Sequence, residues 1–383
     1  MLKQTIDAPG VISTSLGGGF GELYALAAPG DGHVLHALQF SLLGVSSDEH
    51  IRTEPESVSL KVEVPEGARL FGATAGVYSV DQQFWGGWLL GLQLRMNALL
   101  QEAPLTTTLT ETEVPIFPLV MDRPGRAAFY TWRPDGDGAV LWRRTFSAGK
   151  HKPVSMVEQQ LARIPGRPVA SVANAMAEQE STHALLGWVE DSAAGAVLGV
   201  ALIENDLVRI FRSDPIPDAT PFLHQRLNVW GVAFDCVEMT AVVERRTQPS
   251  GYALARFSIG RTLPGDPATG RFDWDRGTAT DLAQIPAGSE LQKQALTMTD
   301  LAIAPGTLHA AAIDSYKQRD GLRLHQTFLL RDGRLLTTHK IAGDFKEFVR
   351  RIPLDDPLAV FTGLGVAYLG VRRPDGTFTV EFL

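Results

Sequence analysis

Cysteine is nearly absent from this sequence: Cys236 is the only one in 383 residues. A disulfide framework is therefore excluded, and nothing in the composition requires an oxidising compartment. Cys236 lies in the apolar segment VAFDCVEMT. Such surroundings favour a buried, inert thiol over a nucleophile.

Long apolar runs and an excess of positive charge are also missing. The N-terminal residues MLKQTIDAPG contain no signal-peptide core, and the stretch WGGWLLGLQLRM is too short and too polar to span a bilayer. The net charge of −8 argues against a protein that wraps nucleic acid. These features predict a soluble, cytoplasmic protein with no nucleic-acid partner.

Sequence motifs of known catalytic or metal chemistry are absent as well. There is no G-x-S-x-G, the nine histidines are scattered, and the glycine-rich segment 17–22 lacks the spacing of a dinucleotide site. The acidic pairs in segments 135–138 and 273–277 lack the other oxygen ligands of a calcium loop. The sequence therefore predicts no catalytic residue, no metal and no cofactor.

What the sequence does contain is strand-like segments. Short runs of Val, Ala, Leu, Phe and Trp alternate with Gly, Pro, Asp and Asn. Helical periodicity is scarce: QFWGGWLLGLQLRMNALLQ, PVSMVEQQLARI and SELQKQAL are the candidates for a helical turn or two, without clear start and stop signals. This pattern predicts an all-β protein.

Hairpin-like segments recur at a nearly constant spacing. Seven of them begin at Glu22, Arg69, Arg126, Thr182, Val237, Leu308 and Gly365. The successive spacings are 47, 57, 56, 55, 71 and 57 residues, so four of the six agree within two residues. Trp132 and Trp188 occupy the same place in consecutive hairpins. A period of this length indicates a repeat architecture.

The flanks of the hairpins repeat too. An apolar run precedes the hairpins, with LTMTDLAIA as the first strand of the sixth unit, and a more polar run follows, with RFDWDRG as the last strand of the fifth. Each unit thus has four strands in about 55 residues, and its polarity rises toward the last strand. Because one unit cannot bury both faces of its sheet, the units must stack around an axis.

This pattern resembles the β-propeller family in its seven-bladed form, without the WD signature. The resemblance implies a single domain of residues 1–383 with four-stranded antiparallel blades. The expected blades cover residues 11–55, 56–112, 113–165, 166–218, 224–285, 293–345 and 355–383 together with 1–8.

Ring closure is predicted from the two ends of the sequence. The last unit contains only three strands, and the segment LKQTIDA near the N-terminus has no hairpin partner of its own. A propeller in which the N-terminal strand completes the last blade has two fewer open sheet edges. The phrase RPDG, at 133–136 and 373–376, then marks the central turns of the third and seventh blades.

Two groups of turn residues are candidates for binding a partner. The predicted central turns of the fifth, sixth and seventh blades carry six basic residues, which are Arg245, Arg246, Lys317, Arg319, Arg372 and Arg373. They are either solvated turn charges or a surface for an anionic partner. Phe84 and Trp85 lie at a turn of the second blade, where they either join the core or anchor an interface.

The sequence favours a non-enzymatic propeller that binds protein partners, or serves as a scaffold subunit of a larger assembly. The alternative is a propeller enzyme, of hydrolase, lyase or lactonase type, with a site at the mouth of the central channel. Such a site would use carboxylates at the ends of inner strands, such as Asp122, Glu178 and Asp235.

Overall fold

The structure is a computed structural model that describes part of the chain. The described residues are 3–6, 11–16, 22–30, 32–39, 56–62, 69–71, 73–74, 85–90, 93–98, 105–123, 126–149, 152–178, 181–204, 206–230, 236–247, 250–260, 293–318, 321–341, 344–351, 358–363, 366–372 and 378–382. Side chains are described mainly within residues 107–259 and 294–336.

Every regular element of the described residues is a β-strand, which confirms the all-β prediction. None of these elements is a helix long and apolar enough to cross a membrane. Five four-stranded antiparallel sheets form away from the largest one. They contain β2 (Val11–Leu16), β3 (Glu22–Gly30), β4 (Gly32–Gln39) and β5 (Glu56–Val62); β6 (Arg69–Phe71), β8 (Trp85–Leu90), β9 (Gln93–Ala98) and β10 (Leu105–Thr108); β19 (Ala219–Trp230), β20 (Cys236–Arg245), β21 (Gly251–Gly260) and β22 (Lys293–Asp300); β23 (Leu308–Gln318), β24 (Gly321–Leu330), β25 (Arg334–Ile341) and β26 (Asp344–Arg351); and β27 (Leu358–Gly363), β28 (Val366–Arg372), β29 (Phe378–Phe382) and β1 (Lys3–Ile6).

The largest sheet consists of two antiparallel halves. One half contains β11 (Val114–Arg123), β12 (Arg126–Asp135), β13 (Gly138–Gly149) and β14 (Lys152–Ile164), and the other contains β15 (Pro168–Glu178), β16 (Ser181–Ser192), β17 (Gly195–Glu204) and β18 (Leu207–Arg212). The halves are joined by parallel pairing of β11 with β15, at Phe117 and Val172. The short strand β7 (Ala73–Thr74) also pairs with β11.

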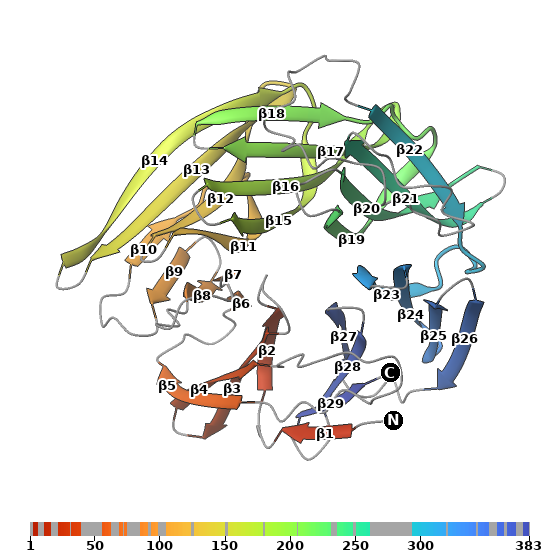
Figure 1. Ribbon diagram of the computed structural model, residues 1–383, viewed down its shortest axis with the longest axis horizontal. Helices are drawn as coiled ribbons and strands as arrows, with labels where there is room; N and C mark the ends of the chain where they lie inside the picture. Colours follow the sequence, from red (N-terminus) through yellow and green to blue (C-terminus); the bar gives the residue numbers. More distant parts are fainter. Residues whose placement is uncertain are drawn as a thin grey trace.

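The sheets follow one another around a ring in sequence order (Figure 1). Within each four-stranded unit the strands are also in sequence order, apart from β1, and the first strand lies toward the middle of the ring. We name each four-stranded unit by its strands, for example the β19–β22 blade. This is the architecture of a β-propeller.

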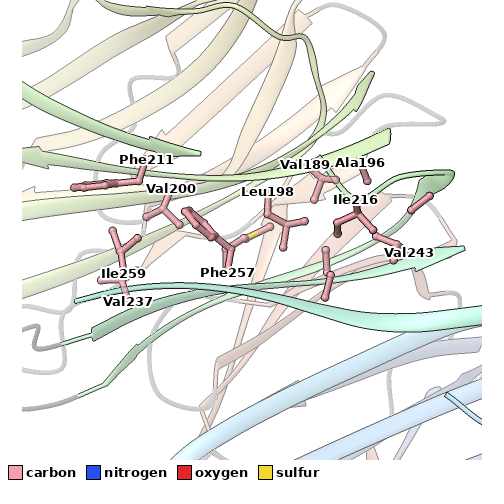
Figure 2. Close-up of a cluster of buried hydrophobic side chains, with 14 of the residues drawn as sticks. Val189, Ala196, Leu198, Val200, Phe211, Ile216, Val237, Val243, Phe257 and Ile259 are labelled. Atoms are coloured by element: carbon pink, nitrogen blue, oxygen red, sulfur yellow. The ribbon is translucent and has the colours of Figure 1, made fainter. Parts of the chain in front are cut away.

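The core lies between neighbouring blades. Between the β15–β18 and β19–β22 blades, residues such as Leu198, Val200 and Phe257 form one buried cluster (Figure 2). A second cluster packs the β11–β14 blade against the β15–β18 blade, and a third joins β19–β22 to β23–β26 through Leu254 and Phe328. The β15–β18 and β19–β22 blades are thus buried on both faces, so their strands carry apolar residues on both sides.

All three candidate helical segments prove to contain strands. Residues 152–164 form β14, which pairs along its length with β13. Residues 85–90 and 93–98 form β8 and β9, and the third segment ends in β22. In each case pairing with a neighbouring strand satisfies the backbone groups that a short isolated helix would leave unpaired at its ends.

The boundary between the fifth and sixth predicted units is wrong. The segment LTMTDLAIA was expected to begin the sixth unit, but its first residues belong to β22, which pairs with β21 as the outer strand of the β19–β22 blade. The next blade begins with β23, so the hairpin from Leu308 contains its first and second strands. The expected outer strand RFDWDRG lies outside the described residues.

The N-terminal strand pairs with the C-terminal one. β1 runs antiparallel to β29, with Lys3 opposite Glu381 and Ile6 opposite Phe378. The sheet is completed by β28 and β27 (Figure 1). Strands from the two ends of the chain thus lie in one sheet.

Candidate interaction face

Each blade has one end that carries the turn between its second and third strands. The same end carries the connection from the fourth strand to the next blade, because the strands alternate in direction. We call this end of the blades the central-turn face. Where side chains are described, its second-to-third turns are 135–138, 192–195, 245–251 and 330–334.

The structure brings only some of the predicted binding residues to this face. Arg245 ends β20 and Arg246 follows it in the turn, while Arg372 ends β28 at the equivalent turn. Lys317 lies near the end of β23, next to the first-to-second turn, at the opposite end of its blade. Trp85 begins β8, also at the end opposite to the second-to-third turn.

The remaining predicted residues, Phe84, Arg319 and Arg373, lie outside the described residues. The placement of Lys317 with the other basic turns was therefore wrong. The reason is a duplicated sequence: the β23–β26 blade has the letters RDG at both 319–321 and 331–333. The second copy is the central turn of this blade, so the residues that sequence reasoning missed are Arg331 and Arg334.

Hydrogen bonds tie the connections between blades to the central turns. In the β11–β14 blade, Arg163 Nε lies 3.2 Å from Asp135 Oδ2. In the next blade, the amide of Ile216 donates to Ala196 O at 2.8 Å, and the amide of Leu198 donates to Ser213 Oγ at 3.0 Å. The loops of this face are thus held by the sheets beneath them.

The same bonding continues toward the β23–β26 blade. The amide of Arg246 donates to Asp218 O at 3.0 Å, and the amide of Gly306 donates to Glu244 Oε1 at 3.0 Å. The amide of Arg331 donates to Thr307 O at 2.8 Å. Hydrogen bonds from backbone amides, one of them to the Glu244 side chain, therefore connect the turns of two blades and the segment between them into one continuous surface.

The charges on this surface are not all free. Arg245 forms an ion pair with Asp300 of the same blade, and only 19% of its side chain is exposed. Arg334 Nε lies 2.6 Å from Asp332 Oδ2. Arg246 and Arg331 are both exposed, and their turns flank the connection 301–307. These two arginines, together with the exposed carboxylates of Asp218 and Asp332, are the charged side chains that border this connection.

A buried ion cluster supports the β11–β14 blade. The Glu113 side chain is fully buried, and its Oε1 accepts a hydrogen bond from Thr131 Oγ1 and lies 2.8 Å from Arg144 Nη1. Arg144 Nε also lies 3.0 Å from Glu158 Oε1. Burial raises the pKa of Glu113, but hydrogen bonds from Arg144, Thr131 and the amide of Thr110 outweigh it and hold the pKa below its ordinary value.

The β15–β18 blade contains a second buried carboxylate. Glu190 is fully buried and accepts hydrogen bonds from Trp188 Nε1 at 2.8 Å and Arg212 Nε at 2.9 Å. Arg212 Nη2 reaches the other carboxylate oxygen, so the pair is bidentate. The carboxylates of Glu113 and Glu190 are thus both occupied by structural contacts.

Trp132 and Trp188 do not occupy equivalent places. Both belong to the cluster between their two blades, with ring centroids 5.1 Å apart. Trp132 is three residues before Asp135, the last paired residue of its strand, whereas Trp188 is four before Ser192. An offset of one residue moves a side chain to the other face of a strand. The two indoles therefore meet across the interface.

Among the residues whose side chains the structure describes, no group of three or more His, Cys, Asp or Glu is placed to hold a metal ion. Cys236 begins β20, and the neighbouring Val237 is fully buried. The carboxylates proposed for a channel site are not resolved as a group, since Asp235 lies outside the described residues and the side chains of Asp122 and Glu178 are not described.

Solved structures similar to this chain cover most of its length. The Nup133 β-propeller domain of Vanderwaltozyma polyspora has a TM-score of 0.44 at 10% identity, covering 95% of this chain and 89% of that one. A mutant of AofleA from Arthrobotrys oligospora has a TM-score of 0.42 at 10% identity, covering 91% and 87%. The WD40 domain of SCAP from fission yeast has a TM-score of 0.39 at 7% identity, covering 100% and 97%.

No protein family matches the sequence, and no curated protein matches it. Four-stranded antiparallel sheets that follow one another around a ring make this chain a β-propeller.

Proposed function

We propose that this protein is a non-enzymatic β-propeller that binds a protein partner through its central-turn face. The observation that carries the proposal is the hydrogen-bonded surface from Asp218 through Arg246 and Gly306 to Arg331. Loops already held in place lose little conformational freedom when they bind, so more of the contact energy remains for affinity.

The partner is expected to present an acidic surface to this region. Arg246 and Arg331 are exposed there, although the whole chain carries a net charge of −8. Exposed arginine side chains on a docking face favour an acidic patch on the partner and steer its approach. Arg245 contributes less than its sequence position suggests, because Asp300 already neutralises it.

We further propose that the propeller has seven blades and that β1 closes the ring. The support is that each half of the largest sheet has the four strands of a complete blade, and that β1 supplies the fourth strand beside β29. A closed ring holds the central turns at fixed distances from one another, which suits a surface used for docking.

The test begins with native affinity purification of the tagged, full-length protein to identify a stoichiometric partner. Association with that partner is then measured at low and moderate salt for the wild type and for Arg246→Glu combined with Arg331→Glu. We expect the double variant to associate more slowly, by about tenfold or more at low salt, and to lose the salt dependence of the wild type.

The matched control reverses two arginines at the opposite end of a blade. Arg123 and Arg126 pair with each other across the turn between β11 and β12. Changing both to glutamate alters the net charge by the same amount at the wrong face. If this control slows association and the Arg246/Arg331 variant does not, the binding face is misassigned; equal melting temperatures of the variants and wild type show that folding is not the cause.

A further inference from the structure

A row of metal-binding residue types crosses the β23–β26 blade. Asp314 of β23 pairs with His325 of β24, and His325 pairs with His339 of β25. Directly opposite residues of an antiparallel sheet lie on the same face, with Cβ atoms about 4.5–5.5 Å apart. The topology therefore places one carboxylate residue and two histidines side by side on three adjacent strands.

The register of this row follows from the turns on either side of it. Gln318 pairs with Gly321, so two residues join β23 to β24. Leu329 pairs with Leu335 across a turn in which Gly333 has a φ of 81°. Short turns fix which residues stand opposite each other.

The core provides a second constraint on the same register. Phe328 of β24 is buried in the cluster that packs this blade against the β19–β22 blade. His325 is three residues earlier in the same strand, so it lies on the other face of the sheet. A slip of one residue would move Phe328 out of the core, which makes the observed alignment the favoured one.

The positions beside the row carry small residue types. At the positions two residues away from the row on each strand, Ala312 pairs with Thr327, and Thr327 pairs with Thr337. At the far end of the row, His339 pairs with Lys346 of β26. The basic end of the row therefore lies at the outer strand.

We propose that Asp314, His325 and His339 form a binding site for a divalent transition metal of the zinc class. Two histidines on opposite positions of neighbouring strands are separated by a distance that one ion spans with Zn–N bonds of about 2.0–2.1 Å. Imidazole and carboxylate donors suit zinc, nickel and copper better than magnesium or calcium. A carboxylate next to a metal-binding histidine orients the ring and raises its basicity.

The role of this site is structural. An ion held by residues of β23, β24 and β25 ties three strands of one blade together, so binding adds to the free energy of unfolding. The spacing along the chain does not reveal the site, because its three members come from different strands. The site lies within the strands and not at the central-turn face, so a test of metal binding does not depend on the proposed partner.

The test is a metal titration of the full-length protein after removal of bound metal with a chelator. Cobalt(II) is added first, and zinc(II) then displaces it. We expect one cobalt per chain, with visible absorption bands of a nitrogen- and oxygen-ligated ion. His325→Gln and His339→Gln should each weaken zinc binding by about 100-fold or more, and Asp314→Asn by about 10- to 100-fold.

The control is His309→Gln, because His309 is an exposed residue of β23 outside the row. This variant should bind zinc as the wild type does. Melting with and without zinc gives a second measurement: zinc should raise Tm for the wild type and His309→Gln, and leave it unchanged for His325→Gln combined with His339→Gln. If the double variant does not fold, the zinc affinity of Asp314→Asn and the number of metal ions bound per wild-type chain test the site instead.

Two results would overturn the site. One is a wild type that binds zinc no more tightly than the double histidine variant. The other is a His309→Gln variant that loses as much zinc affinity as His325→Gln, since binding would then depend on exposed histidines in general.

Discussion

At the scale of single residues, Glu113 is the buried member of a network of four charged side chains. Its buried carboxylate contacts Arg133 and Arg144, and Arg144 in turn contacts Glu158. These residues precede or belong to β11, β12, β13 and β14 in turn. One carboxylate therefore links the whole width of a blade.

Changing Glu113 to Gln is expected to lower the free energy of unfolding by about 3 kcal/mol, because it leaves buried arginine charge with fewer partners. Glu111→Gln, two residues away and exposed, should change stability by less than about 0.5 kcal/mol. Denaturant unfolding at neutral pH measures both. Equal stability of the two variants would contradict a structural role for the Glu113 ion pairs.

The pH dependence of this difference has a definite sign. Because the pKa of Glu113 is lowered in the folded state, its ionisation stabilises the fold above the ordinary glutamate pKa of about 4.3. This stabilisation is lost as the pH falls through the folded-state value. The gap in stability between the wild type and Glu113→Gln should therefore shrink on acidification below about pH 4.3, as measured by unfolding at a series of pH values.

Gly199 tests the packing at the same scale. A Cβ atom added there would overlap the indole of Trp188, which is fully buried. We expect Gly199→Ala to cost about 3 kcal/mol, since neither the ring nor the strand can move freely. Gly306→Ala is the control: its φ is +69° but nothing lies within 4 Å of the added atom, so it reports about 1–2 kcal/mol of backbone strain alone.

At the scale of secondary-structure elements, the pairing of β1 with β29 has the clearest consequence. Deleting residues 1–8 removes β1 and exposes the edge of β29. We expect a loss of several kcal/mol, seen as a lower melting temperature. A peptide of residues 1–8 added in trans should restore part of it, because an open edge accepts a matching strand. An unchanged melting temperature after deletion would rule out β1 as a structural strand.

The outer strands show why element boundaries were hard to predict. Residues 261–292 separate β21 from β22, so the fourth strand of that blade lies far beyond the expected period. The prediction instead chose a nearer polar segment. An outer strand is exposed to solvent on one side, so its sequence has a weak hydrophobic pattern. The strand β22 is identified only by its pairing with β21.

At the scale of the whole molecule, the sequence predicted the propeller best where its repeats are regular. Second strands begin at Arg126, Ser181 and Cys236, which are evenly spaced, and their hairpins were assigned to the right strands. In the β23–β26 blade two RDG turns compete, and spacing alone selected the wrong one. The repeat period gives the number of units, but it does not distinguish the turn between the first and second strands of a blade from the turn between the second and third.

The candidate face was predictable only in part for a related reason. Arg246 was found because its hairpin was correctly aligned, whereas Arg331 was missed with its turn. The ion pair joins Arg245 of β20 to Asp300 of β22, two residues that are 55 apart in sequence, so no local pattern indicates it. The ion clusters around Glu113 and Glu190 escaped prediction in the same way.

The contact between Trp132 and Trp188 gives one blade boundary a spectroscopic signal. Two indoles with centroids 5.1 Å apart and planes inclined by 59° couple their electronic transitions. The ultraviolet circular dichroism of the protein should then contain a paired positive and negative band that neither ring produces alone. Replacing either tryptophan with phenylalanine should abolish the whole pair. Its disappearance during heating, ahead of the strand signal, would mean that these blades separate before their sheets unravel.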